Sequence, residues 1–258
     1  MLRLRAIRRR LALVPLLFLA PLLLLAAAPI AAQEAFTPAQ RAGVVEILRQ
    51  ALREDPSILR EAVAAMEAAD ARDRALAATQ ALVAEREALL RNPVDVVRGN
   101  PRGDVTVVEF FDVRCSYCRQ LIPALNELVR RDPQVRLVLK DLPILGPNSV
   151  LAARALIAAQ RQGKYGELHD ALMALRVEVA EPQIRREAER LGLDWARLRR
   201  DMDDTAVTAR IDANLALARR IGVEGTPAMV IGERLVGGAV PVETLLQLVA
   251  ETRAAQRP

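Results

Sequence analysis

The two cysteines of the chain, Cys115 and Cys118, are separated by two residues, a spacing that suits thiol–disulfide exchange. Residues 105–111 before them are apolar and β-branched, which predicts a buried strand, and residues 120–131 after them carry apolar side chains at helical spacing. The pair is therefore expected at a strand-to-helix junction. There, unpaired backbone N–H groups and the helix dipole are expected to favour the thiolate of Cys115 and so to make it a nucleophile. Cys118, one turn further on, can attack a mixed disulfide formed at Cys115.

Two other roles for the cysteines, a structural disulfide and a metal site, have less support from the sequence. A structural disulfide would close a loop of only four residues and would remove little entropy from the unfolded chain. A zinc ion needs about four ligands, and the only histidine, His169, lies far from the pair in a helical context. The sequence therefore favours redox chemistry and predicts no metal and no cofactor.

The first ten residues contain five arginines, and an apolar run from Leu11 to about Ala32 follows them. This pattern predicts an export signal, residues 1–32, that is cleaved so that the mature chain begins at Gln33. An uncleaved membrane anchor is the alternative, because the run is long enough to span a bilayer. Loss of the five arginines takes the formal net charge from +5 to 0, so the charge gives no indication of nucleic-acid binding. The expected location is an oxidising compartment outside the cytoplasm, where disulfides persist.

Residues 33–92 are rich in Ala, Leu, Glu and Arg and predict a helical segment. Thr37-Pro38 and Asp55-Pro56 are typical helix starts. The apolar faces of the first two helices are too small to form a core of their own, so we expect them to pair in a homo-oligomer, a dimer or trimer. The densely charged stretch that continues to Leu90 is expected to act as a helical spacer. The apolar positions are Val44, Ile47, Leu48, Ile58, Leu59 and Val63.

Residues 93–258 are predicted to form the catalytic domain. Residues 94–103 are rich in turn signals, and residues 135–141 predict a second buried strand. Ser149 is expected to cap a helical insertion covering about residues 148–217, with breaks at Gly163, at Pro182 and at Gly192. Two short strands, 228–231 and 235–236, and a helix opened by Pro241 follow. This order predicts an α/β, thioredoxin-like fold with an inserted helical domain, preceded by an all-helical N-terminal segment.

Three segments, residues 109–118, 163–172 and 222–232, resemble the DsbA family of periplasmic thiol–disulfide oxidoreductases. Residues 36–66 are similar to the N-terminal oligomerisation helices of the ScsC-like branch of that family. The resemblance implies that the partners are exported protein substrates with cysteines and a membrane redox protein.

The resemblance also implies roles for particular residues. Thr226-Pro227 matches the family's cis-proline loop, which would aim backbone groups of Thr226 at an incoming peptide. Glu109 matches the family's buried acid beneath the second cysteine, which could accept the proton of Cys118 through water. Lys140 on the neighbouring strand is the expected charge partner of Glu109, and a structural ion pair is the alternative role for the two. His169 is expected to pack or to hydrogen-bond rather than to catalyse.

The dipeptide between the cysteines, Ser116-Tyr117, departs from the Pro-His of strongly oxidising family members. Without that histidine the reduced form is less favoured, so we expect a milder oxidant. Tyr117 and Thr226 resemble the isomerase members. We therefore predict an exported isomerase or reductase that acts on misfolded or copper-stressed substrates. The alternatives are a DsbA-like oxidase that donates disulfides and a non-catalytic metal-binding or holdase stress protein.

Overall fold

The computed structural model describes residues 36–256, which divide into two units between Ala62 and Val63. The export signal predicted for residues 1–32 lies outside the described residues. Within residues 36–256, none of the helices combines the length and the apolar character that crossing a bilayer requires.

The first unit contains α1 (Pro38–Glu54) and the beginning of α2 (Ser57–Ala84). As predicted, Thr37 caps α1 and Pro38 occupies its first turn. The Thr37 Oγ1 accepts a hydrogen bond from the Gln40 N–H at 3.2 Å, and the Thr37 N–H donates to Gln40 Oε1 at 2.8 Å, so the start of the helix is a complete capping box. No residue of α1 is buried. Its apolar side chains therefore have no core of their own in this unit.

The second unit is built on a five-stranded sheet in the order β1-β3-β2-β4-β5. The strands are β1 (Val96–Gly99), β2 (Val105–Phe111), β3 (Val135–Asp141), β4 (Ala228–Ile231) and β5 (Arg234–Gly237). Only β2 and β3 pair in parallel. The sequence predicted turns where β1 lies. This edge strand has only four residues, of which two are apolar, so it is too short to show a strand period.

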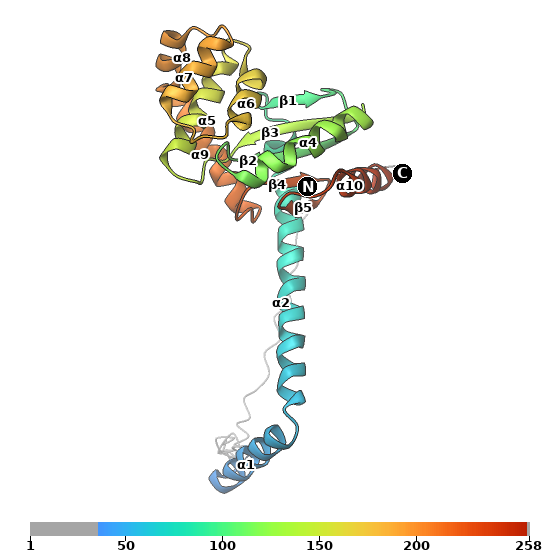
Figure 1. The fold of residues 1–258 in the computed structure, drawn as a ribbon. Helices are drawn as coiled ribbons and strands as arrows, with labels where there is room; N and C mark the ends of the chain where they lie inside the picture. Colours follow the sequence, from blue (N-terminus) through green and yellow to red (C-terminus); the bar gives the residue numbers. More distant parts are fainter. Residues whose placement is uncertain (1–35, 257–258) are drawn as a thin grey trace, which may run out of the picture. The chain divides into compact units, whose positions relative to one another are not determined.

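The two faces of the sheet are covered by different helices (Figure 1). One face, with Val107 and Phe111, packs against α4 (Ser116–Arg131), α10 (Val242–Ala255) and helices of the insertion. The other face, with Val108 and Phe110, packs against α3 (Arg86–Leu90) and α9 (Thr205–Arg220). The alternation follows from the strand period of two residues, which also decides which polar side chains share a face.

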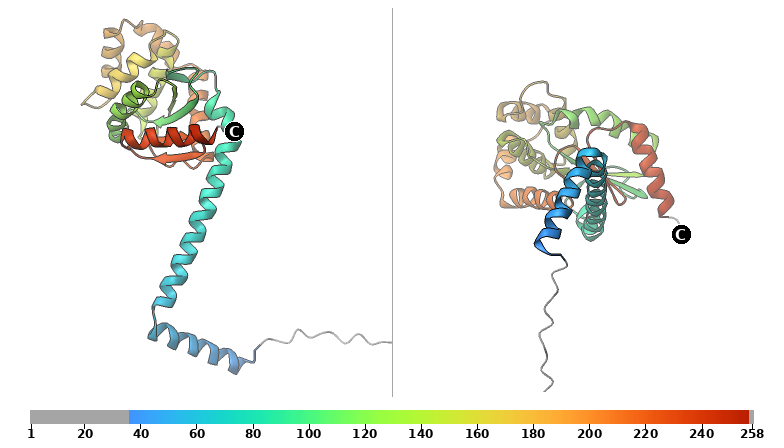
Figure 2. Two further views of the ribbon diagram at one scale, coloured as in Figure 1. Left: turned by 90° about the vertical axis from the view of Figure 1, so that its right-hand side faces the viewer. Right: turned by 90° about the horizontal axis from the view of Figure 1, so that it is seen from below.

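The helical insertion consists of α5 (Pro147–Gln160), α6 (Tyr165–Ala174), α7 (Glu181–Arg190), α8 (Trp195–Met202) and α9 (Thr205–Arg220). These helices gather beside the sheet in both Figure 1 and Figure 2. The prediction that Ser149 caps the insertion is wrong, because α5 begins at Pro147 after Gly146, whose φ of 101° suits glycine. A further break, capped by Asp204, was not predicted. The predicted α/β, thioredoxin-like fold with an inserted helical domain is confirmed.

Candidate active site

The end of β2 and the start of α4 place the two cysteines side by side. Cys115 is the N-cap of α4, and its Sγ accepts a hydrogen bond from the Cys118 N–H at 3.4 Å. Cys118 is completely buried, whereas Cys115 retains 6% of its surface. Both cysteines are free thiols in this structure. The first turn of the helix thus presents Cys115 as the outer sulfur, with a backbone donor directed at it.

A loop between α9 and β4 lies against Cys115. The Sγ of Cys115 donates a hydrogen bond to the carbonyl oxygen of Thr226 at 3.1 Å, and the Thr226–Pro227 peptide bond is cis. The carbonyl oxygen of Pro227 accepts a hydrogen bond from the Gly238 N–H at 2.8 Å, which ties the loop to the end of β5. The structure therefore brings together Cys115, Cys118, Thr226 and Pro227. The catalytic roles of these four residues remain predictions.

The thiol of Cys118 is held in its neutral form. Burial raises the pKa of Cys118 well above that of a free thiol, and the nearby Cys115 and Glu109 act in the same direction. A hydrogen bond from the backbone N–H of Asp112 opposes the shift only in part. Because a thiolate is the attacking species in disulfide exchange, Cys118 needs a proton acceptor when it attacks.

Glu109 supplies a buried carboxyl group on the same face of β2 as Phe111. The side chain is 1% exposed, and its Oε1 has no hydrogen-bond partner among the described residues. Burial raises the pKa of Glu109 to about 8, with the positive charge of Arg98 opposing the rise. A group with this pKa can both take up and release a proton near neutral pH.

The predicted pairing of Lys140 with Glu109 is wrong. In the parallel ladder Glu109 lies opposite Leu139, so Lys140 points to the other face of the sheet. There its Nζ lies 2.6 Å from Oδ2 of Asp95, and both side chains are buried. The cation that acts on Glu109 is instead Arg98 of β1. Only the register of β3 against β2, together with the period of two, excludes the predicted pair.

His169 is a buried packing residue of α6, in agreement with the prediction. Its Nδ1 lies 2.9 Å from Oδ1 of Asp170, and its ring meets that of Phe111 edge-on with centroids 4.9 Å apart. Burial lowers the pKa of His169, so its imidazole is neutral at pH 7. The same face also holds Asp141, whose pKa burial raises to about 6 and whose Oδ2 accepts a hydrogen bond from the Tyr165 hydroxyl.

Asp112 is a site residue that the sequence interpretation missed. Its buried carboxylate accepts hydrogen bonds from the backbone N–H groups of Ile144 at 2.9 Å and Leu145 at 3.0 Å, and from that of Arg114 at 2.8 Å. These contacts bind the loop after β3 to the turn that carries Cys115. An aspartate directly after a buried strand is the sequence signal that could have indicated this role.

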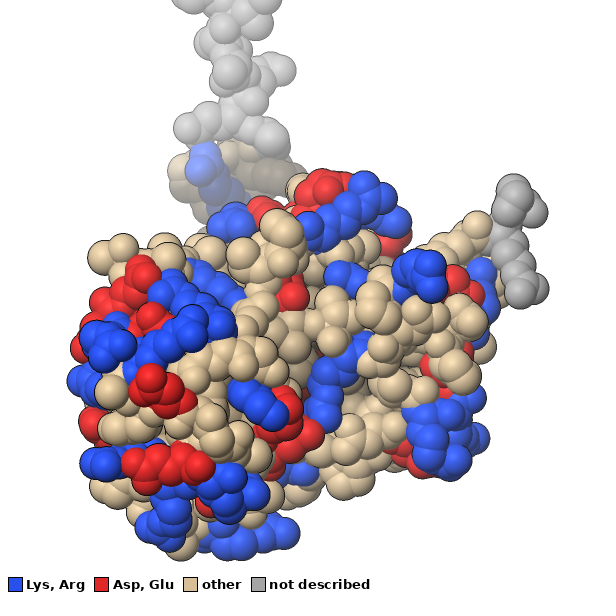
Figure 3. Space-filling view, turned by 90° about the horizontal axis from the view of Figure 1, so that it is seen from above, with Lys and Arg blue, Asp and Glu red and all other residues tan. Residues whose placement is uncertain are grey.

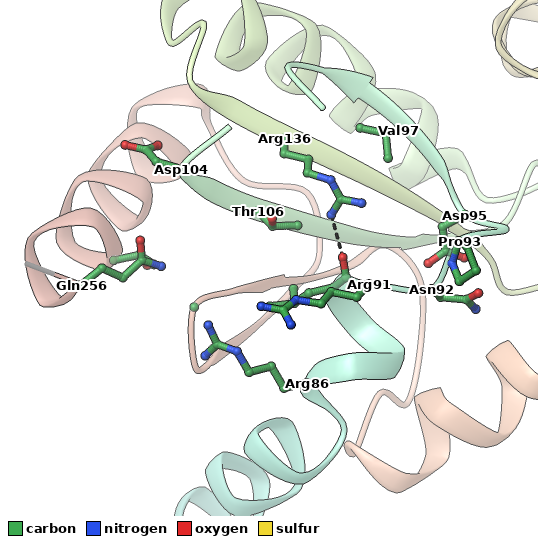
Figure 4. Close-up of a pocket in the computed structure, with 13 residues that line it drawn as sticks. Arg86, Arg91, Asn92, Pro93, Asp95, Val97, Asp104, Thr106, Arg136 and Gln256 are labelled. Atoms are coloured by element: carbon green, nitrogen blue, oxygen red, sulfur yellow. Dashed lines mark hydrogen bonds between the residues drawn. The ribbon is translucent and has the colours of Figure 1, made fainter. Parts of the chain in front are cut away.

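A separate cavity lies near the starts of β2 and β3, whereas the cysteines follow the end of β2 (Figure 4). Arg86, Arg91 and Arg136 line it, and Nη1 of Arg136 donates a hydrogen bond to the carbonyl oxygen of Leu90 at 2.9 Å. Its position excludes direct contact with a substrate held at Cys115. Residues 36–256 contain no group of three or more His, Cys, Asp or Glu side chains that could hold a metal ion.

Comparison with known proteins shows the family to which most of the second unit is similar. The sequence profile of the DSBA-like thioredoxin domain matches residues 106–250. A thioredoxin-like oxidoreductase from Silicibacter pomeroyi is 46% identical, with a TM-score of 0.64 over 66% of this chain and 98% of that structure. ScsC of Proteus mirabilis in a transitional conformation is 28% identical, with a TM-score of 0.64 over 85% of this chain and 100% of that structure.

One similar protein carries the name of a Na(+)/H(+) antiporter. The Na(+)/H(+) antiporter NhaA 3 of Salinispora tropica is 37% identical over 165 residues, which are 63% of this chain. The match covers 25% of the antiporter, so the chain spans about a quarter of the length of this relative. The similarity therefore concerns one part of that protein.

Proposed function

Because this chain belongs to the family of DSBA-like thioredoxin domains, we propose that it exchanges disulfides with exported substrate proteins through Cys115 and Cys118. The observation that supports this most directly is the environment of the outer sulfur. The Cys118 N–H donates to it, and the Thr226 carbonyl lies 3.1 Å from it. A nucleophilic sulfur, a resolving thiol and a peptide-facing loop are the parts that exchange requires.

The reaction proceeds in two displacements. The thiolate of Cys115 attacks one sulfur of a substrate disulfide, a new S–S bond forms, and the other substrate sulfur leaves as a thiolate. Cys118 then loses its proton and attacks Sγ of Cys115, which releases the substrate dithiol and leaves a Cys115–Cys118 disulfide. In isomerisation a substrate thiol attacks the mixed disulfide instead, and the enzyme returns to its dithiol form. Thr226 is placed to contact the substrate backbone beside Cys115.

Glu109 is the proposed acceptor of the Cys118 proton. The two groups affect each other electrostatically, since the charge of Glu109 raises the pKa of Cys118. The pKa of about 8 matches the carboxyl group to proton transfer near neutral pH. A water molecule between them would carry the proton, because Glu109 has a buried oxygen without a partner.

The residues between the cysteines favour isomerisation or reduction over oxidation. Tyr117 is 61% exposed and supplies no positive charge to Cys115. The only histidine of the chain, His169, is buried in α6 and cannot stabilise the Cys115 thiolate from the dipeptide position. The dithiol form is then less favoured than in a strong oxidant, so the Cys115–Cys118 disulfide is a weaker donor.

The N-terminal helices support a homo-oligomer, a dimer or trimer. Large apolar side chains on α1 and on the first turns of α2 are 44–70% exposed, although such groups gain about 25 cal/mol for each Å² removed from water. Copies of the chain would cover them by pairing these helices. In a dimer or trimer, two or three Cys115–Cys118 sites would act on the same misfolded substrate. The exposed residues are Val44, Val45, Ile47, Leu48, Ile58, Leu59 and Val63.

Export completes the proposal. Residues 1–32 would direct the chain to the periplasm and would be cleaved on export. Substrates with disulfides occur there, and a membrane redox protein would restore the dithiol.

A trapping experiment tests the exchange. Cys118→Ser leaves Cys115 able to attack but removes the thiol that resolves the mixed disulfide, so substrate proteins should stay attached. They are detected as bands of higher mass on non-reducing gels that disappear on reduction. The double variant with Cys115→Ser is the control and should trap nothing. If Cys118→Ser captures no proteins, the assigned roles of the two cysteines are wrong.

The direction of exchange is tested in cells. Acid quenching followed by alkylation reports the steady-state redox form of the pair. A dithiol agrees with an isomerase or reductase, whereas a disulfide would identify an oxidase and contradict this part of the proposal.

A further inference from the structure

A groove runs along the outer side of the first turns of α4, between this helix and α6. It has a volume of about 530 Å³ and begins at Ser116, the residue directly after the nucleophile. Arg119 and Gln120 line it from α4, and Asp170, Met173 and Arg176 line it from α6 and the loop that follows. A peptide whose cysteine reacts at Cys115 would therefore pass the mouth of this groove with its neighbouring residues.

The groove carries positive charge that nearby acids do not balance. Asp170 is already engaged, because Arg98 of β1 donates to both of its oxygens at 2.9 and 2.7 Å. The next carboxylate along the loop, Glu178, accepts hydrogen bonds from Arg114 and Asn148. Arg176 is exposed and makes no hydrogen bond or ion pair with the residues that the structure describes.

Arg119 is the second uncompensated cation. It lies one turn after Cys115, and its only hydrogen bond through the side chain runs from Nη2 to the carbonyl oxygen of Val113 at 3.3 Å, among the residues described. Its Nε is buried and has no partner there. The contact with Val113 holds the guanidinium beside the active-site turn without neutralising it, so an anionic group in the groove would find a fixed donor.

We propose that this groove binds acidic side chains of substrate segments next to the reacting cysteine, with Arg119 and Arg176 as the specificity-determining residues. The inference rests on the proposed exchange at Cys115 and names the substrate class that the same site prefers. Basic and acidic side chains lie next to one another over the face shown in Figure 3, so that face carries no charge of a single sign.

The test compares two disulfide peptides with the same sequence except for the residues that flank one cysteine, which are glutamate in one peptide and glutamine in the other. Reduction of each peptide by the dithiol form of the full-length protein gives a kcat/KM value, and the ratio of the two values measures the preference. We expect the glutamate peptide to be favoured through a lower KM. The preference should shrink in about 0.5 M salt, where the Debye length falls to about 4 Å.

Arg176→Glu should lower the preference for the glutamate peptide by about threefold to tenfold, since it removes an exposed ion pair with the peptide and adds repulsion between like charges. Arg186→Glu on α7 makes the same change at an exposed arginine that does not line the groove, and it should keep the wild-type ratio. A wild-type ratio near one, or equal ratios in Arg176→Glu and Arg186→Glu, would overturn this inference while exchange itself persists. Absence of exchange with both peptides would overturn the proposed function as well.

Discussion

The Nζ atom of Lys140 lies 2.6 Å from Oδ2 of Asp95, and both side chains are buried beneath the sheet. Asp95 directly precedes β1 and Lys140 belongs to β3, so the ion pair fastens the segment that enters the domain to the centre of the sheet. Burial lowers the pKa of Lys140, and the charge and hydrogen bond of Asp95 oppose this change. Asp95 thus favours the charged form of the lysine.

Removal of one partner should therefore destabilise the fold strongly. We expect Asp95→Ala to lower the free energy of unfolding by about 3–5 kcal/mol, because it leaves a buried ammonium group without a counter-ion. Urea denaturation at pH 7 measures the loss. The double variant Asp95→Leu, Lys140→Met keeps the volume without the charges and should recover most of the stability. Equal stability of Asp95→Ala and the wild type would mean that the pair is not needed for the fold.

Glu109 should make stability fall as pH rises toward 8. Its pKa is about 8 in the folded protein and 4.5 for an unperturbed glutamate, so between these pH values the unfolded chain binds fewer protons and a rise in pH favours unfolding. Asp141 acts with the same sign only up to about pH 6, and His169, whose pKa burial lowers, acts with the opposite sign because the unfolded histidine binds more protons than the folded one. Between pH 7 and 8 the free energy of unfolding should therefore drop by up to about 1.4 kcal/mol per pH unit.

Glu109→Gln should remove that slope, because an amide does not titrate. Urea denaturation at several pH values from 7 to 8 compares the variant with the wild type. The same variant should slow release of substrate from the mixed disulfide by about 10²-fold, since the proton acceptor of Cys118 is lost. If the slope disappears but release keeps its rate, Glu109 is a structural residue and takes no part in the exchange.

Asp112 should control the order of the loop beside Cys115. Asp112→Ala leaves the N–H groups of Ile144 and Leu145 without their acceptor, which costs about 1–3 kcal/mol. We expect faster amide hydrogen exchange at these two positions and slower exchange with peptides, with the sheet intact. Asp112→Asn retains one carbonyl oxygen as an acceptor and should show a smaller effect. Unchanged protection of Ile144 and Leu145 in Asp112→Ala would contradict the role assigned to the carboxylate.

The sequence was most informative where local chemistry decides the structure. β2 and β3 were predicted over their full lengths because both are mostly apolar, β-branched runs bounded by turn signals. Thr37 and Pro38 identified the start of α1 because capping depends on adjacent residues. The placement of Cys115 beside Thr226 followed from a family resemblance, since the two residues are far apart in the chain.

The sequence was least informative where the structure depends on packing between distant segments. The pairing of Lys140 required the register of β3 against β2 and the existence of β1, a strand whose two apolar residues gave no period. The groove between α4 and α6 was not predicted, because Arg119 and Arg176 come together only through the fold of the insertion. The loop contacts of Asp112 depend on the same kind of tertiary proximity.

The exposed apolar face of α1 leads to a prediction about assembly. Ile47 is 70% and Leu48 is 56% exposed, and the helix has no buried residue of its own. If copies of the chain pair through this face, the mature protein is a dimer or trimer in light scattering at micromolar concentration. Ile47→Asp with Leu48→Asp should give a monomer, because a pairing interface would then bury two carboxylates without partners. Arg53→Asp, an exposed change on the same helix outside the apolar set, should keep the oligomer.

The monomeric variant also separates reduction from isomerisation. The cysteines, the sheet and the Thr226 loop all lie in the second unit, so insulin reduction should continue at the wild-type rate. The rate at which scrambled ribonuclease refolds should fall. Correction of a wrong disulfide requires a free thiol to remain available while the substrate stays bound, and a site on a monomer loses the substrate between attempts. A wild-type protein that is monomeric at micromolar concentration would remove the basis for the oligomer. Full isomerisation by the monomeric variant would show that a single Cys115–Cys118 site is sufficient.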